Sequence, residues 1–222
     1  MHIDEQTFIY FGCLVVAVIL HEISHGVVAL WFGDRTAKEA GRLTLNPVPH
    51  IDPFGSIVLP AMGAIVGLPV FGYAKPVPVN PNRLHKPRRD MLYVSLAGPA
   101  TNLALMLVAA IVARLLYQNG PNVLFYDQLP LGTRIIFTFA VVNLLLGLFN
   151  LLPIPPLDGG QIFPAIWESI KRRAAKLLGR PDPGPVDVAK LMPVAYVVAL
   201  VFIAWSGLIL VADVINPVRL PQ

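Results

Sequence analysis

The amino-acid sequence predicts an all-α membrane protein, a polytopic helical bundle of four to five spans with a re-entrant or hairpin segment. The first reason is composition: 55% of the 222 residues are hydrophobic and only 14% are charged, whereas soluble domains carry about 25% charged residues. The second is that four apolar runs are each long enough to cross a bilayer, which takes about 20 helical residues. The third is that most basic residues lie between these runs.

The same composition excludes several other classes of protein. A disordered chain or a nucleic-acid-binding module needs more charge than this chain has. A disulfide-stapled secreted domain needs more than one cysteine, and the chain contains only Cys13. The length leaves room for one membrane domain, so residues 1–222 are expected to form a single integral membrane domain.

The predicted spans follow one another with one interruption. They lie at 7–32, 91–117, 134–152 and 191–213. The first run is too long for a cleavable signal peptide, and it follows acidic instead of basic residues. A fifth apolar run, at 54–73, is interrupted by glycines and prolines, so we expect it to cross as a broken helix or to dip into the membrane and return.

Two further segments have a recognisable pattern. In YAKPVPVNP, at 73–81, apolar residues alternate with prolines, which predicts an extended strand or a hairpin. The run at 168–180 holds five basic residues in a helical pattern, which predicts an amphipathic helix on the anionic cytoplasmic leaflet.

The distribution of charge predicts the topology. If 54–73 re-enters the membrane, the segments 33–90 and 153–190 share one side and hold 14 of the 17 lysines and arginines. The positive-inside rule favours this arrangement, because the alternative spreads the basic residues more evenly. The acidic N-terminus is then expected outside the cell.

An HExxH motif, His21-Glu22-Ile23-Ser24-His25, lies within the first predicted span. Residues four apart share one face of a helix, so His21 and His25 can bind one metal ion. Zinc accepts imidazole nitrogen readily and, in catalytic sites, takes three protein ligands and a water. Glu22 follows the first ligand, where its carboxylate can accept a proton from that water. Ionisable residues are costly inside a membrane, so the cluster is expected to be functional.

A third zinc ligand is needed, and Asp158 is the best candidate. It lies in NLLPIPPLDGG, at 150–160, where Pro153 ends the preceding helix and two glycines allow a tight turn after the carboxylate. An aspartate at such a position is more often a cap or a turn residue. Here a ligand role is favoured instead, because the zinc site needs a third ligand and the other carboxylates lie in polar connecting segments.

The sequence resembles the site-2 protease family of intramembrane zinc metalloproteases. Three motifs carry the resemblance: HEISH at 21–25, AGPATN at 97–102 and NLLPIPPLDGG at 150–160. The segments DPFGS and YAKPVPVNP are similar to those of short prokaryotic members. The resemblance covers about residues 7–170, the expected metal-site core, and there is no PDZ domain near 118–133, where many relatives insert one.

The resemblance implies roles for individual residues. In that family the corresponding side chains bind one zinc ion and provide the general base: His21, His25 and Asp158 as ligands, and Glu22 as the base. Asn102, in AGPATN, corresponds to a residue thought to stabilise the substrate carbonyl, and an amide donor to an oxyanion contributes about 3 kcal/mol. A hydrogen bond that merely joins two spans is an equally weighted alternative. Asn150 is expected to support the turn that presents Asp158.

The expected function is that of a zinc metalloendopeptidase that hydrolyses peptide bonds in or near transmembrane segments, in the prokaryotic plasma membrane. Its partners would be a transmembrane protein substrate and the lipid bilayer, with no nucleic acid. In the absence of a soluble domain, the membrane core or a partner would select substrates, and that partner would be a second copy or a regulatory membrane protein. A zinc transporter or a catalytically silent scaffold is the alternative, although the sequence lacks the internal repeats typical of transporters.

Overall fold

The computed structural model describes residues 5–58, 73–116 and 129–184, together with the single positions 62, 193, 196, 197, 200 and 201. Throughout these residues the regular structure is helical, without a β strand. The chain divides into two compact units, Met1–Leu151 and Leu152–Gln222. The prediction of an all-α protein is therefore confirmed for the part that the structure describes.

Three helices of the first unit are long and apolar enough to cross a membrane: α1 (Glu5–Trp31), α4 (Pro87–Leu116) and α5 (Leu131–Asn150). They confirm three of the four predicted spans, those at 7–32, 91–117 and 134–152. The span predicted at 191–213 and the run at 54–73 lie largely outside the described residues.

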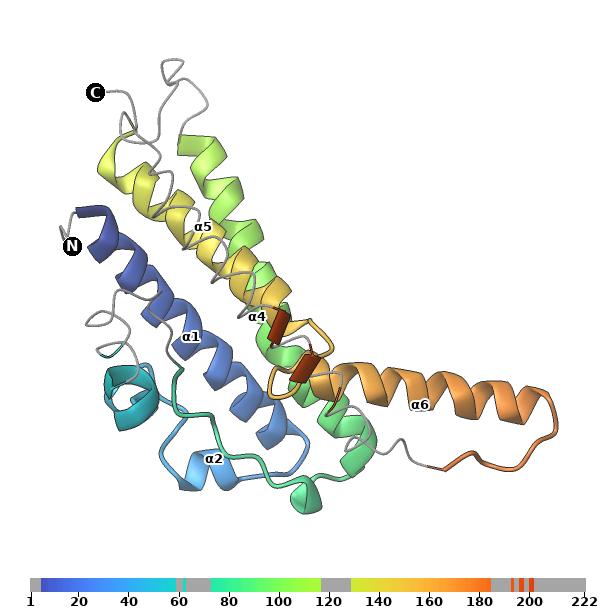
Figure 1. The fold of residues 1–222 in the computed structure, drawn as a ribbon. Coiled ribbons are helices and arrows are strands. Elements are labelled where there is room, and N and C mark those ends of the chain that lie inside the picture. Colours follow the sequence, from blue (N-terminus) through green and yellow to red (C-terminus); the bar gives the residue numbers. More distant parts are fainter. Residues whose placement is uncertain are drawn as a thin grey trace. The chain divides into compact units, whose positions relative to one another are not determined.

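The three spans pack against one another in pairs, as the blue, green and yellow helices of Figure 1 show. Small residues lie at the contacts: Ala17 and Ala29 of α1 are completely buried. At Gly147 of α5, an added Cβ would lie only 3.3 Å from the Cβ of Asn102 in α4. Membrane helices commonly use such small residues to bring their backbones close together.

Local signals set the ends of α1 and α4. At the end of α1, Gly33 has φ of +103°, and the N–H of Asp34 donates to the carbonyl of Ala29 at 2.9 Å. A residue with positive φ is a common way to end a helix. At the start of α4, the carboxylate of Asp90 accepts a hydrogen bond from the N–H of Lys86 at 2.6 Å, which satisfies an otherwise unpaired donor.

The described residues between α1 and α4 form four short helical turns: α2 (Thr36–Glu39), η1 (Val48–His50), η2 (Pro53–Val58, a π-helical turn) and η3 (Pro81–Arg83). The segment 73–80, which we name the Pro-rich segment, is neither helix nor strand. The prediction of an extended strand or a hairpin at 73–81 is therefore wrong for the described residues, among which the segment pairs with no strand. Its prolines lack the N–H groups that a ladder requires.

The second unit contains α6 (Gly159–Leu177), which confirms a helix in most of the run predicted at 168–180. Exposed apolar side chains recur at the spacing of a single helix face: Phe163, Ile166, Trp167, Ile170 and Leu177. Basic side chains occupy other positions on the same helix: Lys171, Arg172, Arg173 and Lys176. The helix is therefore amphipathic, as predicted.

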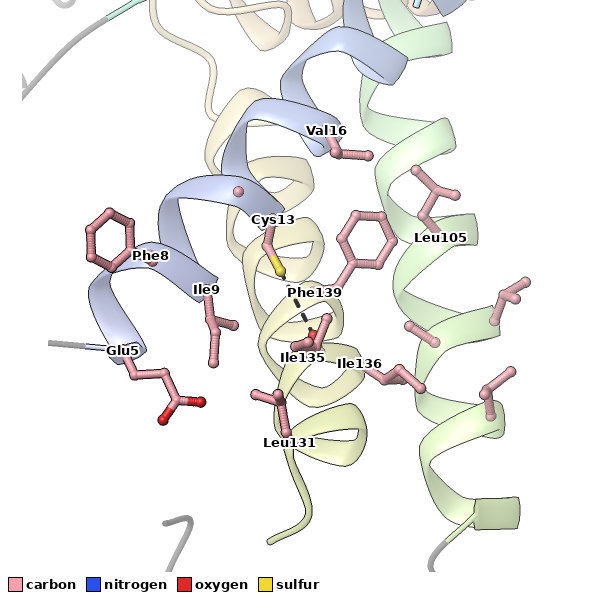
Figure 2. Close-up of a pocket in the computed structure, with 14 residues that line it drawn as sticks. Glu5, Phe8, Ile9, Cys13, Val16, Leu105, Leu131, Ile135, Ile136 and Phe139 are labelled. Atoms are coloured by element: carbon pink, nitrogen blue, oxygen red, sulfur yellow. Dashed lines mark hydrogen bonds between the residues drawn. The ribbon is translucent and has the colours of Figure 1, made fainter.

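An apolar groove of about 840 Å³ lies between α1, α4 and α5, beside the N-terminal half of α1 (Figure 2). Phe8, Ile9, Cys13 and Val16 line it from α1, together with Phe139 and other apolar side chains of α5 and α4. Glu5 is the one charged residue in its lining. None of the candidate zinc ligands lines the groove, so it is distinct from the candidate site.

Candidate metal centre

Two histidine side chains of α1 converge one helical turn apart. His21 and His25 are buried, with 5% and 9% of their surfaces exposed. Their Nε2 atoms lie 3.1 Å apart. Two nitrogen ligands of a tetrahedral zinc ion, each about 2.0–2.1 Å from the metal, are roughly 3.3 Å apart. The pair therefore fits two coordination positions of one zinc ion.

The other ring nitrogen of each histidine faces a carbonyl oxygen of α4. The Nδ1 atom of His21 lies 2.5 Å from Oδ1 of Asn102, and the Nδ1 atom of His25 lies 2.7 Å from the main-chain carbonyl oxygen of Val94. A carbonyl oxygen only accepts, so each Nδ1 carries the proton and donates. Each Nε2 then presents its lone pair, as a metal ligand must.

Gly98 allows α4 to approach the histidine pair. A Cβ at this position would lie 2.6 Å from the Nε2 atom of His21 and 2.6 Å from that of His25. Carbon and nitrogen atoms do not approach so closely, so a larger residue would displace one or both rings. The sequence placed Gly98 in a family motif, but its spatial role follows only from the packing of α4 on α1.

A buried pair of amides, Asn102 of α4 and Asn143 of α5, stands behind His21. Both side chains are completely buried. Nδ2 of Asn102 donates to Oδ1 of Asn143 at 2.8 Å, and Nδ2 of Asn143 donates to the carbonyl of Phe139 at 2.8 Å. Asn102 was singled out from the sequence, whereas Asn143 was not, because it belongs to none of the quoted motifs.

Glu22, the predicted general base, is held by the Pro-rich segment. Its Oε2 accepts a hydrogen bond from the N–H of Val77 at 2.8 Å. The side chain of Val77 packs against Gly26 of α1. An added Cβ on Gly26 would lie only 3.0 Å from Cγ1 of Val77. Gly26 and Glu22 are one turn apart on α1, so this close packing brings the amide of Val77 to the carboxylate.

The far end of the Pro-rich segment is fixed by Asp34. One carboxylate oxygen accepts from the N–H of Asn80 at 2.6 Å, and the other accepts from the N–H and hydroxyl of Thr36. Burial opposes ionisation of Asp34, but these hydrogen bonds and the nearby charge of Arg83 outweigh it and lower the pKa of the carboxyl. Asp34 therefore binds the segment as an anion at neutral pH.

Asp158 belongs to the second unit and directly precedes α6. Its main-chain carbonyl accepts from the N–H groups of Gln161 and Ile162, both at 2.9 Å, while its carboxylate makes no capping hydrogen bond. A tight turn surrounds it, because a Cβ on Gly160 would lie 2.7 Å from the backbone nitrogen of Pro155. Asp158 is thus the N-cap residue of α6 by position, but its side chain does not cap the helix.

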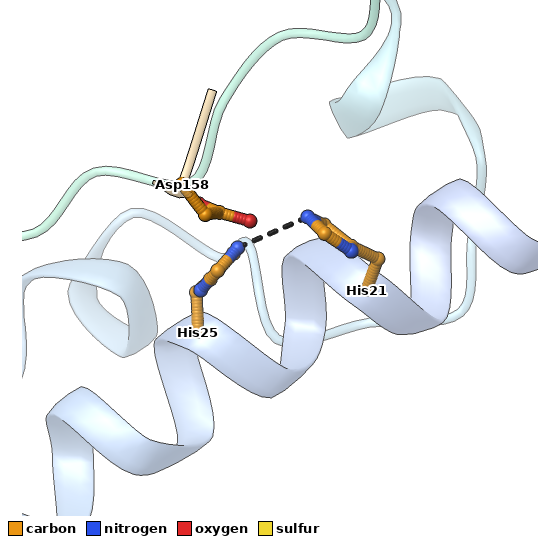
Figure 3. Close-up of side chains that lie close together, drawn as sticks. All are labelled: His21, His25 and Asp158. Atoms are coloured by element: carbon orange, nitrogen blue, oxygen red, sulfur yellow. Dashed lines mark hydrogen bonds between the residues drawn. The ribbon is translucent and has the colours of Figure 1, made fainter. Parts of the chain in front are cut away.

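The chemistry of these side chains gives one candidate metal-binding group in the described part of the chain. It consists of His21, His25 and Asp158, each of which offers one ligand atom (Figure 3). Two imidazole nitrogens and a carboxylate oxygen are a donor set that catalytic zinc uses, with a fourth position left open.

Asn150 lies at the end of α5, where its amide donates to the carbonyl of Leu146 at 3.0 Å.

Comparisons with known proteins agree with this chemistry. The sequence pattern of Peptidase family M50 matches residues 9–133 and 128–179. The chain is 43% identical to "Putative zinc metalloprotease YwhC" of Bacillus subtilis, over 67% of this chain and 64% of that protein. It is 38% identical to "Putative zinc metalloprotease Rip2" of Mycobacterium tuberculosis, over 65% of this chain and 52% of that protein.

A third relative is "Zinc metalloprotease Rip1" of Mycobacterium tuberculosis, 36% identical over 46% of this chain and 26% of that protein. The chain thus spans less than two thirds of the length of each of these relatives. No solved structure matches it.

The match to the family covers most of α1 and all of α4, α5 and α6, and so includes both the HExxH motif and Asp158. Zinc is the metal in the names of the relatives. The three candidate spans and the family agree on a multi-pass membrane protein, as the sequence predicts. The resemblance found in the motifs is confirmed: the chain belongs to peptidase family M50, the site-2 protease family.

Proposed function

We propose that this chain is an intramembrane zinc metalloprotease that hydrolyses peptide bonds in or near the transmembrane segments of other proteins. One observation carries the proposal: two histidine Nε2 atoms converge within a candidate membrane span. The carboxylate of Glu22 lies in the same motif, and family membership supports the same chemistry. One zinc ion is proposed, with His21, His25 and Asp158 as its protein ligands.

The chain's own residues would then carry the proton transfers. When bound, zinc supplies a Lewis acid that polarises the scissile carbonyl and makes water a better nucleophile. Glu22 accepts the proton of the attacking water and passes it to the leaving amine. The hydrogen bond from Val77 to Oε2 holds the carboxylate in one orientation for this transfer.

The position of the motif determines what a substrate must do. A peptide bond within a helix has its carbonyl engaged by the N–H four residues later, so a transmembrane substrate must unwind locally before cleavage. Helix-breaking residues in the substrate would favour cleavage for this reason. Water must also reach the site, which requires a polar route from the cytoplasmic side.

The proposal extends to the architecture of the whole chain. We infer that residues 1–222 form one integral membrane domain of four to five spans with a re-entrant or hairpin segment and a metal-site core of about 7–170. The run at 54–73 crosses as a broken helix in the five-span arrangement and re-enters in the four-span arrangement. The partners are a transmembrane substrate, the bilayer, and either a second copy or a regulatory membrane protein. The apolar face and basic residues of α6 suit the surface of an anionic leaflet.

The test compares wild type with Glu22→Gln on a panel of single-span reporter proteins, and zinc is assayed in both. We expect the wild type to cut, and Glu22→Gln to retain one zinc ion without cutting. Glu39→Gln is the matched control, because Glu39 is an exposed carboxylate paired with Arg83 at 2.7 Å. That variant should cut at the wild-type rate.

Three results would contradict the proposal. Cleavage by Glu22→Gln at the wild-type rate would show that Glu22 is not the base. Zinc in both proteins with cleavage by neither would favour a transporter or a scaffold. A wild-type protein without zinc under metal-replete conditions would overturn the ligand assignment.

A further inference from the structure

We propose that Asn143 and Asn102, the amide pair, act together as positioning residues that fix the tautomer and orientation of His21. This inference rests on the proposed function, since it concerns a residue proposed as a zinc ligand. The side chain of Asn143 is hydrogen-bonded to Asn102 and to the main chain of Phe139. Its influence would reach His21 through Asn102.

The hydrogen bond between Asn143 and Phe139 decides which group donates and which accepts in the series from Phe139 to His21. The main-chain carbonyl of Phe139, in α5, can only accept, so the side chain of Asn143 must direct its NH₂ group there. The side-chain carbonyl oxygen of Asn143 therefore faces Asn102, and the NH₂ group of Asn102 donates a hydrogen bond to it.

The orientation of Asn102 in turn determines the tautomer of His21. Since the NH₂ group of Asn102 faces Asn143, its Oδ1 faces His21 and requires a donor there. Only the tautomer with a proton on Nδ1 supplies one. The opposite tautomer would set two acceptors against each other in a completely buried place, and it would put a proton on the Nε2 atom that must bind the metal.

The two histidines therefore depend on different supports. His25 donates to a main-chain carbonyl, that of Val94, which no side-chain substitution removes. His21 depends on two side chains from two other helices. A substitution in the amide pair should consequently disturb His21 and spare His25.

This geometry also bears on the two roles that the sequence left for Asn102. Its NH₂ group donates to Asn143 at 2.8 Å and approaches the carbonyl of Ala17 at 3.5 Å. Those donors point toward the helix interfaces of the first unit. The hydrogen bonds thus support a positioning role for Asn102 in preference to donation to a substrate oxyanion.

The experiment uses the full chain in detergent micelles with ¹⁵N-labelled histidine, and it has two readouts. The first is the pair of ¹⁵N chemical shifts of His21 in the metal-free protein, which distinguishes the Nδ1–H from the Nε2–H tautomer. The second is the dissociation constant for Zn²⁺, measured by competition with a chelator. Neither readout requires the protein to cut anything, so failure of the protease proposal would not affect the result.

For Asn143→Leu we expect His21 to populate the Nε2–H tautomer while His25 keeps its proton on Nδ1. The dissociation constant for Zn²⁺ should rise by about 10- to 100-fold, the usual effect of removing a group that orients a metal-binding histidine. Thr138→Val is the matched control, since Thr138 is another buried polar residue of α5, outside the amide pair. It should leave both readouts unchanged.

A second pair of variants keeps the proposal testable if Asn143→Leu does not fold. Asn102→Asp retains an acceptor for Nδ1 of His21 and should keep the Nδ1–H tautomer, whereas Asn102→Leu should lose it. Wild-type shifts for His21 in Asn102→Leu or in folded Asn143→Leu, with unchanged Zn²⁺ affinity, would overturn the proposal.

Discussion

At the scale of single residues, the orientation of Glu22 depends on one backbone amide. Val77 lies between Pro76 and Pro78, which have no N–H, so within this tripeptide only Val77 can donate a hydrogen bond. That donor reaches Oε2 of Glu22 at 2.8 Å. The N–H of Val77 is therefore the one backbone donor of this tripeptide, and it binds the carboxylate of Glu22, the proposed base.

Val77→Pro should slow cleavage by about 10- to 100-fold, because a hydrogen bond to a charged group contributes about 1.5–3 kcal/mol. The measurement is kcat on a cleavable reporter at saturating concentration. Val77→Ala keeps the N–H and loses only side-chain packing, so it serves as the control and should retain most activity. Equal losses in the two variants would show that packing matters and the hydrogen bond does not.

Gly98→Ala should lose zinc and activity together. Alanine normally stabilises a helix relative to glycine by about 1 kcal/mol, but here its Cβ would lie 2.6 Å from two proposed ligand atoms. Zinc content and reporter cleavage are the measurements. Gly12→Ala in α1 is the control, because nothing lies within 4 Å of a Cβ at that position. Normal zinc content in Gly98→Ala would contradict the close approach of α4.

The ligand types could be predicted from sequence, but their supports could not. HExxH encodes its geometry locally, since four residues of helix place both rings on one face. The supporting residues are about 50 to 120 positions away in the sequence from the side chains that they support, so only tertiary packing shows the relation. These residues are Gly98, Asn143 and Val77. A lone asparagine in an apolar run gives no indication of which partner it meets.

At the scale of elements, the Pro-rich segment is held at several points instead of being paired as a strand. The N–H of Lys75 donates to the carbonyl of His50 at 2.9 Å, that of Val77 to Glu22, and that of Asn80 to Asp34. Alternation of apolar residues predicted a strand or a hairpin, which the described residues do not form. The pattern alone does not show whether the hydrogen-bond partners of such a segment are another strand or side chains and loops.

Asp34→Asn should loosen this segment in a pH-dependent manner. The folded-state pKa of Asp34 is lowered, so its carboxylate stabilises the fold above the unfolded-state pKa near 4 and loses that effect as pH falls through the lower folded-state value. We expect a loss of about 1–3 kcal/mol at neutral pH, because an amide NH₂ would face the N–H of Asn80.

The measurement for Asp34→Asn is the free energy of unfolding from pH 7 down to pH 3, relative to wild type. The difference should stay constant to about pH 5 and narrow below about pH 4. Asp52→Asn offers a comparison, since Asp52 also binds backbone N–H groups, but those of Phe54 and Gly55 instead of that of Asn80. A difference that persists undiminished to pH 3 would contradict an ionised Asp34 as the clamp.

At the scale of the whole molecule, the proposed zinc ligands come from both units of the chain. His21 and His25 belong to Met1–Leu151, and Asp158 belongs to Leu152–Gln222. Long apolar runs and the HExxH and LDGG motifs allowed the spans and the donor set to be predicted, because hydropathy and helix periodicity are local signals. The division into units could not be predicted, since it depends on contacts between distant segments.

Zinc should therefore stabilise the wild-type chain more than a chain without the third ligand. At a free Zn²⁺ concentration 100 times the dissociation constant, mass action predicts a gain of about 2.7 kcal/mol in the free energy of unfolding. At that same concentration Asp158→Asn should gain much less, because two imidazoles alone bind the ion weakly. Hydrogen exchange at the start of α6 should slow with zinc in the wild type but not in Asp158→Asn.

Asp182→Asn is the control for that comparison, since Asp182 is an exposed carboxylate of the second unit that pairs with Arg172 at 3.3 Å. It should respond to zinc as the wild type does. An equal zinc response in Asp158→Asn and wild type would remove Asp158 from the ligand set. The metal would then act within the first unit alone, and the proposed mechanism would need another third ligand from that unit.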